Sequence, residues 1–229
     1  MKHQMSWLTV PDDAATAELE RLTEPWRSRG ERVPPVMGVL KRSPNAFQAV
    51  LGLNYALAFG ASSLGRRREE LIATCVSALN DCFFCLATHA RYLEKVWRGS
   101  EAEFSKLLAE LTALGARLRR GEPSPLAELS ALPGLESGDA ELLEFVIELS
   151  LAPQDNGHAL YARLRAAGYS ETEVLDAVLV CACFAFMNRL ACGTGVALEA
   201  SKYEAAVRLF GQTALDRHVA WAAGSTKDE

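Results

Sequence analysis

The 229-residue chain has no sustained alternation of apolar and polar residues, which is the pattern of a half-buried β-strand. It has no long basic run either: the formal net charge is −5, both signs are mixed along the chain, and the only basic cluster is Arg66–Arg68. We interpret that triplet as the solvated start of a helix. Without a basic face, nucleic acid is not an expected partner.

Uninterrupted apolar runs are also missing. The most hydrophobic stretch, residues 174–198, contains Asp176, Asn188 and Arg189, whereas a membrane span needs about twenty mostly apolar residues. We therefore expect a buried helix there and no membrane partner. The first residues lack the apolar run of a signal peptide. Six cysteines without such a signal favour a reducing compartment, so we expect a cytoplasmic protein that carries thiols.

Helix-starting and helix-ending residues are plentiful, and hydrophobic residues make up 49% of a chain long enough for a sizeable core. The fold class predicted is all-α, as a single helical domain over residues 1–229 with two lobes. Residues 121–138 contain three prolines and are the best candidate for a lobe boundary. The helices are predicted over residues 13–23, 44–59, 64–79, 82–97, 101–120, 139–151, 157–167, 171–190 and 196–210, with a loop at 32–35 and a frayed tail at 224–229.

Three residues of the predicted 82–97 helix, Cys82, Cys85 and His89, fall on one face. Successive residues advance by about 100° around a helix, so the three lie within about 60° of one another. Cys85 and His89 are four residues apart, which lets the imidazole reach the sulfur.

The place of these thiols at a helix start matters as much as their spacing. With Asn80 or Asp81 as the cap, Cys82 lies in the first turn, where the helix dipole stabilises a thiolate. A neighbouring imidazole can take the thiol proton. Two sulfurs one turn apart can then pass through thiolate attack, sulfenic acid and an intramolecular disulfide. Helix position alone favours Cys82 as the more acidic thiol.

Other interpretations of these residues remain open. Cys82, Cys85 and His89 could be part of a zinc site, although a closed structural site needs a fourth ligand. They could also be purely structural. We expect no metal and no cofactor. Glu70, taken alone, is an exposed helix-start acid. Two histidines, His158 and His218, and four cysteines, Cys75, Cys181, Cys183 and Cys192, are expected to have no role in the chemistry, the cysteines being small core residues.

Arg189 interrupts an otherwise apolar helix, and an unpaired buried cation costs several kcal/mol. We therefore predict that Arg189 is paired, in a polar cluster with Asn188 where the lobes meet, near Glu70. The alternative is that Arg189 reaches solvent at a helix edge.

Glu70, Cys82, Cys85 and His89 form the pattern Glu-x11-Cys-x2-Cys-x3-His. On these residues and their flanks the chain resembles the carboxymuconolactone decarboxylase/alkylhydroperoxidase-D superfamily, in its peroxidase-related branch. The resemblance implies an all-helical homo-oligomer that reduces alkyl hydroperoxides and takes electrons from an unidentified thiol or dithiol donor. It also implies that Cys85 attacks the peroxide, that Cys82 resolves it, and that His89 and Glu70 form a proton relay through the first cysteine and water.

Phe83 and Phe84 stand between the two cysteines, where some members of the superfamily carry a second histidine. They indicate either an apolar mouth suited to a hydrophobic peroxide or simple inward packing of one ring. Two other functions remain as alternatives: a lactone decarboxylase-like acid–base enzyme, and a non-enzymatic zinc or redox-sensing protein. The cysteine pair argues against the first, because acid–base chemistry needs no second thiol.

Overall fold

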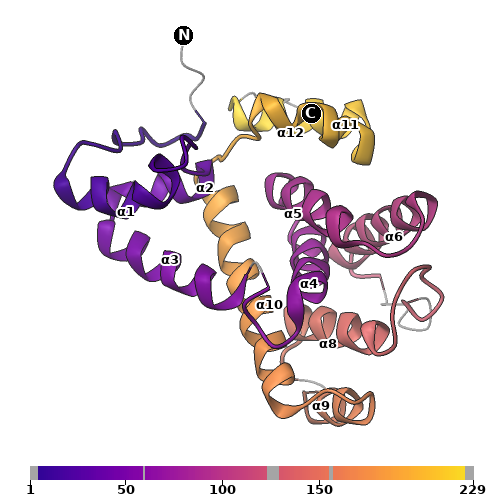
Figure 1. The fold of residues 1–229 in the computed structure, drawn as a ribbon. Helices are drawn as coiled ribbons and strands as arrows, with labels where there is room; N and C mark the ends of the chain where they lie inside the picture. The colour runs from indigo at the N-terminus through magenta and orange to yellow at the C-terminus, as the bar shows by residue number, and fades with distance from the viewer. Residues whose placement is uncertain (1–4, 59, 123–128, 155–156, 225–229) are drawn as a thin grey trace. The chain divides into compact units, whose positions relative to one another are not determined.

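The computed structural model describes residues 5–58, 60–122, 129–154 and 157–224 (Figure 1). Every regular element in these ranges is a helix, which confirms the predicted all-α class. In chain order the helices are α1 (Ala17–Arg27), α2 (Pro35–Gly38), the 3₁₀ helix η1 (Val39–Arg42), α3 (Pro44–Leu57), α4 (Gly65–Leu79), α5 (Phe83–Val96), α6 (Glu101–Arg119), α8 (Asp139–Leu151), α9 (Gly157–Ala166), α10 (Glu171–Gly193), the 3₁₀ helix η2 (Ala200–Lys202), α11 (Tyr203–Phe210) and α12 (Gln212–Ala222).

Two helix starts, those of α6 and α10, follow the capping chemistry predicted from the sequence. Ser100 and Glu103 form a full capping box at the start of α6. The pKa of Glu103 is held below its usual value, mainly because its carboxylate accepts a hydrogen bond from the backbone N–H of Ser100 and also because it accepts one from the Ser100 hydroxyl. Ser170 and Glu173 exchange the equivalent bonds at the start of α10, at 2.8 and 3.2 Å.

The first helix differs from the prediction. Asp12 accepts a turn bond from Ala14 N at 3.0 Å, and the cap of α1 is instead Thr16, which accepts from Leu19 N at 3.1 Å. The helix also continues past Pro25. Proline removes one backbone donor, and its place near the end of α1 limits the cost of that loss.

The last predicted helix, over residues 196–210, is confirmed only from residue 200 onward. Residues 196–198 form a link in which Leu198 N donates to His218 Nε2 at 3.0 Å, and helix begins again only at η2. Gly211, with φ 82°, then separates α11 from α12, a helix that the sequence analysis missed. A non-glycine residue would be strained at this φ, so the glycine allows the break.

The chain divides into two compact units. The terminal unit comprises residues 1–55 and 190–229, and the central unit comprises residues 56–189. The predicted lobe boundary at 121–138 therefore lies inside the central unit, and residues 123–128 of it lie outside the described ranges. The predicted fraying of residues 225–229 also falls outside them. The assignment of one domain to the whole chain stays a prediction.

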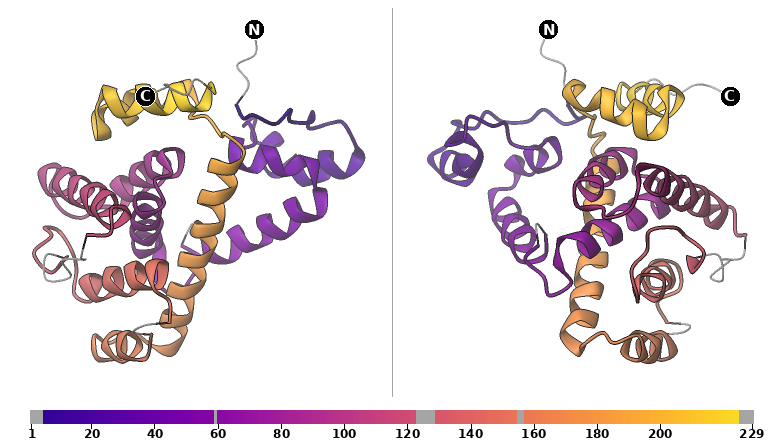
Figure 2. Two further views of the ribbon diagram at one scale, coloured as in Figure 1. Left: turned by 180° about the vertical axis from the view of Figure 1, so that it is seen from behind. Right: turned by 45° about the vertical axis from the view of Figure 1, so that its right-hand side comes forward.

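Helix α4 is the core of the central unit. It packs against α5, α6 and α8 (Figure 2), and its side chains from Glu69 to Leu79 are all buried. The approach of α6 is closest at Gly115, where an added Cβ would lie 2.4 Å from the carbonyl oxygen of Ala78. Any larger residue at position 115 would push α6 away from the C-terminal end of α4.

Of the described helices, only α10 is long and apolar enough to cross a membrane by length and composition, and half of its most apolar window is buried. A core helix has the same properties. In the central unit its buried face includes Ala177, Val180 and Phe184. The opposite stripe, with Leu175 and Phe186, is exposed. The predicted buried helix is thus confirmed for one face of α10.

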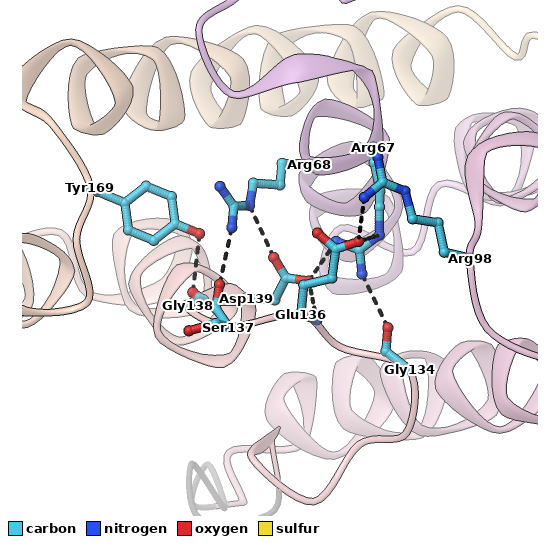
Figure 3. A network of polar contacts seen from close by, with 9 residues as sticks. All are labelled: Arg67, Arg68, Arg98, Gly134, Glu136, Ser137, Gly138, Asp139 and Tyr169. Atoms are coloured by element: carbon cyan, nitrogen blue, oxygen red, sulfur yellow. Dashed lines mark hydrogen bonds and ion pairs between the residues drawn. The ribbon is translucent and has the colours of Figure 1, made fainter.

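Arg67 and Arg68 are not solvated, which corrects the prediction for the basic triplet. Both pair with Asp139 at the start of α8, at 2.6 and 3.1 Å (Figure 3). Arg67 also donates to the Gly134 carbonyl at 3.1 Å, and Arg68 to that of Ser137 at 3.0 Å. The two arginines therefore fasten the start of α4 to the segment that leads into α8.

Asp139 is fully buried at the centre of this network. Besides the two guanidinium groups it accepts the Glu136 backbone N–H at 2.8 Å. The turn before it requires glycine: Gly138 has φ 84°, and an added Cβ would lie 2.9 Å from the ring of Tyr169. Tyr169 donates its hydroxyl to the Gly138 carbonyl at 3.1 Å.

Asp139→Asn should lower the free energy of unfolding by about 3–5 kcal/mol, because it leaves two arginines facing a neutral partner at a buried position. Urea unfolding of wild type and variant measures this. Glu136→Gln is the matched control: Glu136 pairs with Arg67 and Arg98 but is 38% exposed, so it should cost less than about 1 kcal/mol. An equal fall in the free energy of unfolding in Asp139→Asn and Glu136→Gln would show that Asp139 contributes no more to stability than Glu136.

His218 in the terminal unit should make stability depend on pH. Burial lowers its pKa to about 4, whereas an unfolded imidazole titrates near about 6.5. Between these values the unfolded chain binds a proton that the folded chain does not, so stability should fall by up to about 1.4 kcal/mol per pH unit as the pH drops through this window. Denaturant titrations at pH 7 and pH 5 test the slope. His218→Gln should flatten it, and His158→Gln, at an exposed position, should not.

Candidate active site

Two adjacent glutamates on α4 have different surroundings. The carboxylate of Glu69 accepts three hydrogen bonds from the preceding loop: from Gly60 N at 2.6 Å, Ser62 N at 2.8 Å and Ser62 Oγ at 2.7 Å. Glu70 faces α5 instead. Glu69 therefore closes a loop, and Glu70 is the acid available for chemistry.

Glu70 is buried, with 4% of its side chain exposed, and both carboxylate oxygens are occupied. Oε2 lies 2.7 Å from Nδ1 of His89, and Oε1 lies 2.7 Å from Nη2 of Arg66. An ionised carboxylate only accepts hydrogen bonds. Nδ1 of His89 must therefore carry the hydrogen of this bond, which leaves Nε2 as the basic nitrogen of a neutral imidazole.

Aromatic rings surround the imidazole of His89. The ring of Phe184, from α10, meets it edge-on with centroids 4.4 Å apart, and the ring of Tyr92 lies at 6.0 Å. These contacts and the Glu70 bond fix the ring plane. Because His89 is only 18% exposed, water has limited access to it.

Cys82 and Cys85 lie at the start of α5, as predicted, but the cap differs. Neither Asn80 nor Asp81 caps this helix: Asn80 ends α4, and Cys82 itself is the residue before the first turn of α5. The first helical bond runs from Leu86 N to Cys82 O at 2.8 Å. Cys85 is thus in the first turn, and both sulfurs are near the positive end of the helix dipole. Helix position does not single out Cys82. Both cysteines are thiols and nearly fully buried.

Arg119 of α6 holds the turn that carries Cys82. It donates to the last carbonyl groups of α4, at 2.6 Å to Ala78 and 3.2 Å to Leu79, and pairs with Asp81 at 3.2 Å. Asp81 has φ 55°, the only positive value among the described non-glycine residues. Aspartate tolerates this conformation better than most residues. The tight turn lets α5 start with only three residues between it and the end of α4.

Asn188 supports the same turn from α10. It accepts a hydrogen bond from Asn80 at 3.0 Å and donates one to Ser77 Oγ at 3.1 Å. The carbonyl of Ser77 in turn accepts the backbone N–H of Cys82 at 3.0 Å. The predicted polar cluster therefore exists at Asn188, but at the thiol end of α4 and within the central unit.

The predicted pairing of Arg189 near Glu70 is wrong. Arg189 is exposed and donates to the carbonyl of Ala185 on its own helix at 2.9 Å. It continues the exposed stripe of α10 that includes Phe186, so solvent satisfies its charge. The cation on Glu70 is instead Arg66, which the sequence analysis had read as solvated. The available signal was the four-residue spacing of Arg66 and Glu70 on one helix.

Four cysteines lie outside the pair. Burial raises the pKa of the Cys75 and Cys181 thiols and raises that of Cys183 to about 11. Cys192 is half-buried. A raised pKa leaves little thiolate at neutral pH, so Cys75, Cys181 and Cys183 are poor nucleophiles. Within the described ranges no three His, Cys, Asp or Glu side chains come together in a way that could hold a metal ion.

A known protein family matches the part of the chain that carries this site. Residues 44–114 match the model of the Carboxymuconolactone decarboxylase family, and that segment contains Glu70, Cys82, Cys85 and His89. No match is found among curated proteins.

Solved structures share the fold. The alkylhydroperoxidase AhpD core of an uncharacterized peroxidase-related protein from Ralstonia eutropha JMP134 has a TM-score of 0.64 at 21% identity, over 88% of this chain and 96% of that one. An uncharacterized peroxidase-related protein from Silicibacter sp. TM1040 has 0.64 at 22% identity, over 87% and 95%. The debrominase Bmp8 in its apo form has 0.65 at 13% identity, over 91% and 98%. The family match thus covers the segment that carries the candidate site, and the solved structures share the fold over most of the chain.

Proposed function

We propose that this protein is a thiol-dependent peroxidase that reduces alkyl hydroperoxides through the Cys82–Cys85 dithiol. The observation that carries the proposal is the bond between Glu70 and His89 at 2.7 Å, with His89 on the same helix, α5, that begins at the two cysteines. This arrangement joins a base, an acid that orients it and a thiol pair. It is the arrangement expected of an activated sulfur nucleophile.

The reaction proceeds in two balanced steps. The thiolate of Cys85 attacks the outer oxygen of the hydroperoxide, the O–O bond breaks, and the leaving alkoxide takes a proton to give an alcohol. Cys85 is now a sulfenic acid. Cys82 attacks its sulfur, the S–O bond breaks, and water leaves as the disulfide forms. An external thiol or dithiol then restores the two thiols and is itself oxidised.

His89 and Glu70 move the protons. Nε2 of His89 takes the proton of the attacking thiol and returns it to the leaving oxygen. Glu70 holds Nδ1 in its protonated form and stabilises the imidazolium. The resemblance had implied a relay that runs through the first cysteine and water. We propose a simpler route from thiol to His89, with Glu70 behind it: Cys85 lies one turn before His89 on α5, and Glu70 contacts Nδ1 of His89 directly at 2.7 Å.

The residues around the thiols and His89 suggest what kind of peroxide the site accepts. Phe84 is buried and Phe83 is half-buried beside the thiols, and Phe184 lies against His89. This apolar lining favours a hydrophobic organic peroxide. We also propose a homo-oligomer in the cytoplasm, on the superfamily resemblance and on the exposed apolar stripe of α10.

Reductive debromination is a second candidate, because Bmp8, a debrominase, shares the fold over most of both chains. A thiolate would attack bromine in place of oxygen, the C–Br bond would break and the carbon would take a proton; the second thiol would then displace bromide from the sulfur, and the same disulfide would form. Incubating the reduced protein separately with cumene hydroperoxide and with a bromopyrrole distinguishes the two. A lactone decarboxylase would oxidise no thiol with either.

One equivalent of cumene hydroperoxide should convert Cys82 and Cys85 to a disulfide. Site-resolved mass spectrometry should show the loss of two hydrogens on this pair. Cys192→Ser, which removes a half-buried thiol outside the site, should behave like wild type. Independent oxidation of each sulfur to sulfinic acid would contradict the paired mechanism.

His89→Ala should slow peroxide consumption at pH 7 by about 10²–10⁴-fold, because the general base is lost. Glu70→Gln should also slow it, because the uncharged amide stabilises the imidazolium less. Raising the pH should partly rescue both variants as thiolate forms without help. The pH dependence of initial rates measures this.

Stability has to be followed in the same variants. Glu70 is buried, not the exposed acid expected from its sequence position, so Glu70→Gln should cost about 1–3 kcal/mol of unfolding free energy. Glu69→Gln is the contrasting control: it loosens the loop at Gly60–Ser62 and should lower stability while keeping most of the turnover. Full activity at pH 7 in both His89→Ala and Glu70→Gln would show that these two residues do not form a proton relay.

A further inference from the structure

Arg66 touches the proposed relay from the side opposite to His89. Its guanidinium lies 2.7 Å from Oε1 of Glu70 and stands over the ring of Tyr92, 5.3 Å from the centroid. Its side chain is 26% exposed, so it is partly shielded from water. The two arginines that follow bind Asp139 instead. Of the triplet, Arg66 alone contacts the relay.

We propose that Arg66 is a positioning residue for the redox thiols: it cancels the charge of Glu70 and so lets the His89–thiol pair give up a proton at neutral pH. This inference rests on the proposed function only in that His89 serves the thiols. It adds a third member to the Glu70–His89 pair.

The negative charge of Glu70 must be balanced within the site. A carboxylate as buried as Glu70 needs a compensating cation close by. If Arg66 supplies it, His89 can be neutral, and the site of Arg66, Glu70, His89 and the thiols has no net charge. Without Arg66 the compensation would come from a proton held between Glu70 and His89. Whichever of the two binds that proton, His89 can no longer accept one from a thiol.

The summed charge of the site also determines whether removing Arg66 raises or lowers the pH of thiol activation. With Arg66 present, the site has a charge of +1 when His89 and both thiols are protonated. The loss of one proton brings that charge to zero. Without Arg66 it must go from zero to −1 in a shielded environment, which is less favourable. Removing Arg66 should therefore move thiol activation to higher pH.

Other groups that face His89 leave this balance unchanged. Tyr92 contacts His89 from α5, where Cys85 lies one turn before it, and Phe184, whose ring carries no charge, contacts it from α10. Lys95 is the other cation near this cluster, with its Nζ 5.8 Å from the Tyr92 centroid. It is exposed, and it shares Tyr92 with Arg66 without lying on Glu70. Lys95 is therefore a matched control for a positive charge in this region.

The experiment measures how the alkylation rate of Cys82 and Cys85 by iodoacetamide depends on pH. Site-resolved mass spectrometry follows the reduced protein from pH 5 to pH 10. Alkylation needs no peroxide, so it reports thiol activation independently of the proposed reaction. Four variants are compared with wild type: Arg66→Gln, Arg66→Met, Arg66→Lys and Lys95→Gln. Arg66→Met keeps an apolar stem on the ring of Tyr92 and tests the loss of charge with packing retained.

For Arg66→Gln and Arg66→Met, the pH of half-maximal alkylation should rise by about one unit, which is about tenfold slower alkylation at pH 7. Arg66→Lys keeps a cation four residues from Glu70 and should restore most of the wild-type profile. Lys95→Gln should leave the profile within about a quarter of a unit, as expected of an exposed charge. Peroxide consumption measured in parallel should follow the same profiles.

Three results would overturn the proposal. These are an unchanged profile in both charge-removing variants, an equal fall of alkylation at every pH, and a shift in Lys95→Gln as large as that in Arg66→Gln. A shifted profile in a protein that consumes no peroxide would support the role of Arg66 and refute the proposed peroxidase. Rapid peroxide consumption with an unshifted profile would do the reverse.

Discussion

The carboxylate of Glu70 constrains the rest of the site because it is buried on the core helix of the central unit. Its charge must be balanced within hydrogen-bond reach, and the chain does so from two sides, with Arg66 one turn earlier on α4 and His89 on α5. The position of α5 relative to α4 is therefore tied to an electrostatic requirement. The same contact selects the tautomer of His89 and aims its basic nitrogen away from the carboxylate.

The elements around this contact hold the short turn from α4 to α5 in place. Arg119 binds the end of α4, Asn188 binds Ser77, and Gly115 allows α6 to lie directly against Ala78. None of these residues carries chemistry. They locate Cys82 through backbone atoms, so the sulfur position depends on rigid helices and not on a mobile loop.

Much of the helix pattern could be predicted, because capping residues and prolines mark helix ends locally. The capping boxes at Ser100 and Ser170 are examples. The break at residues 196–202 could not, since it depends on Met5 and His218, which are distant in sequence. In the same way the partner of Arg67 and Arg68 lies some seventy residues away. The four site residues came from a family pattern, and spacing alone explained only three of them. The prediction that Arg189 is paired near Glu70 failed because the sequence of an apolar helix does not reveal which of its faces is exposed to solvent.

The site residues fall within a short stretch, from Arg66 to His89, on two consecutive helices. Closing so short a loop costs little chain entropy, so this helical pair can form early as the chain folds. The residues that complete it, Phe184 and Asn188, arrive from about a hundred positions downstream. A partly folded chain would then hold its thiols together before the aromatic wall covers them. Such an intermediate would be the form most exposed to overoxidation, and a nascent chain would be vulnerable until α10 has docked.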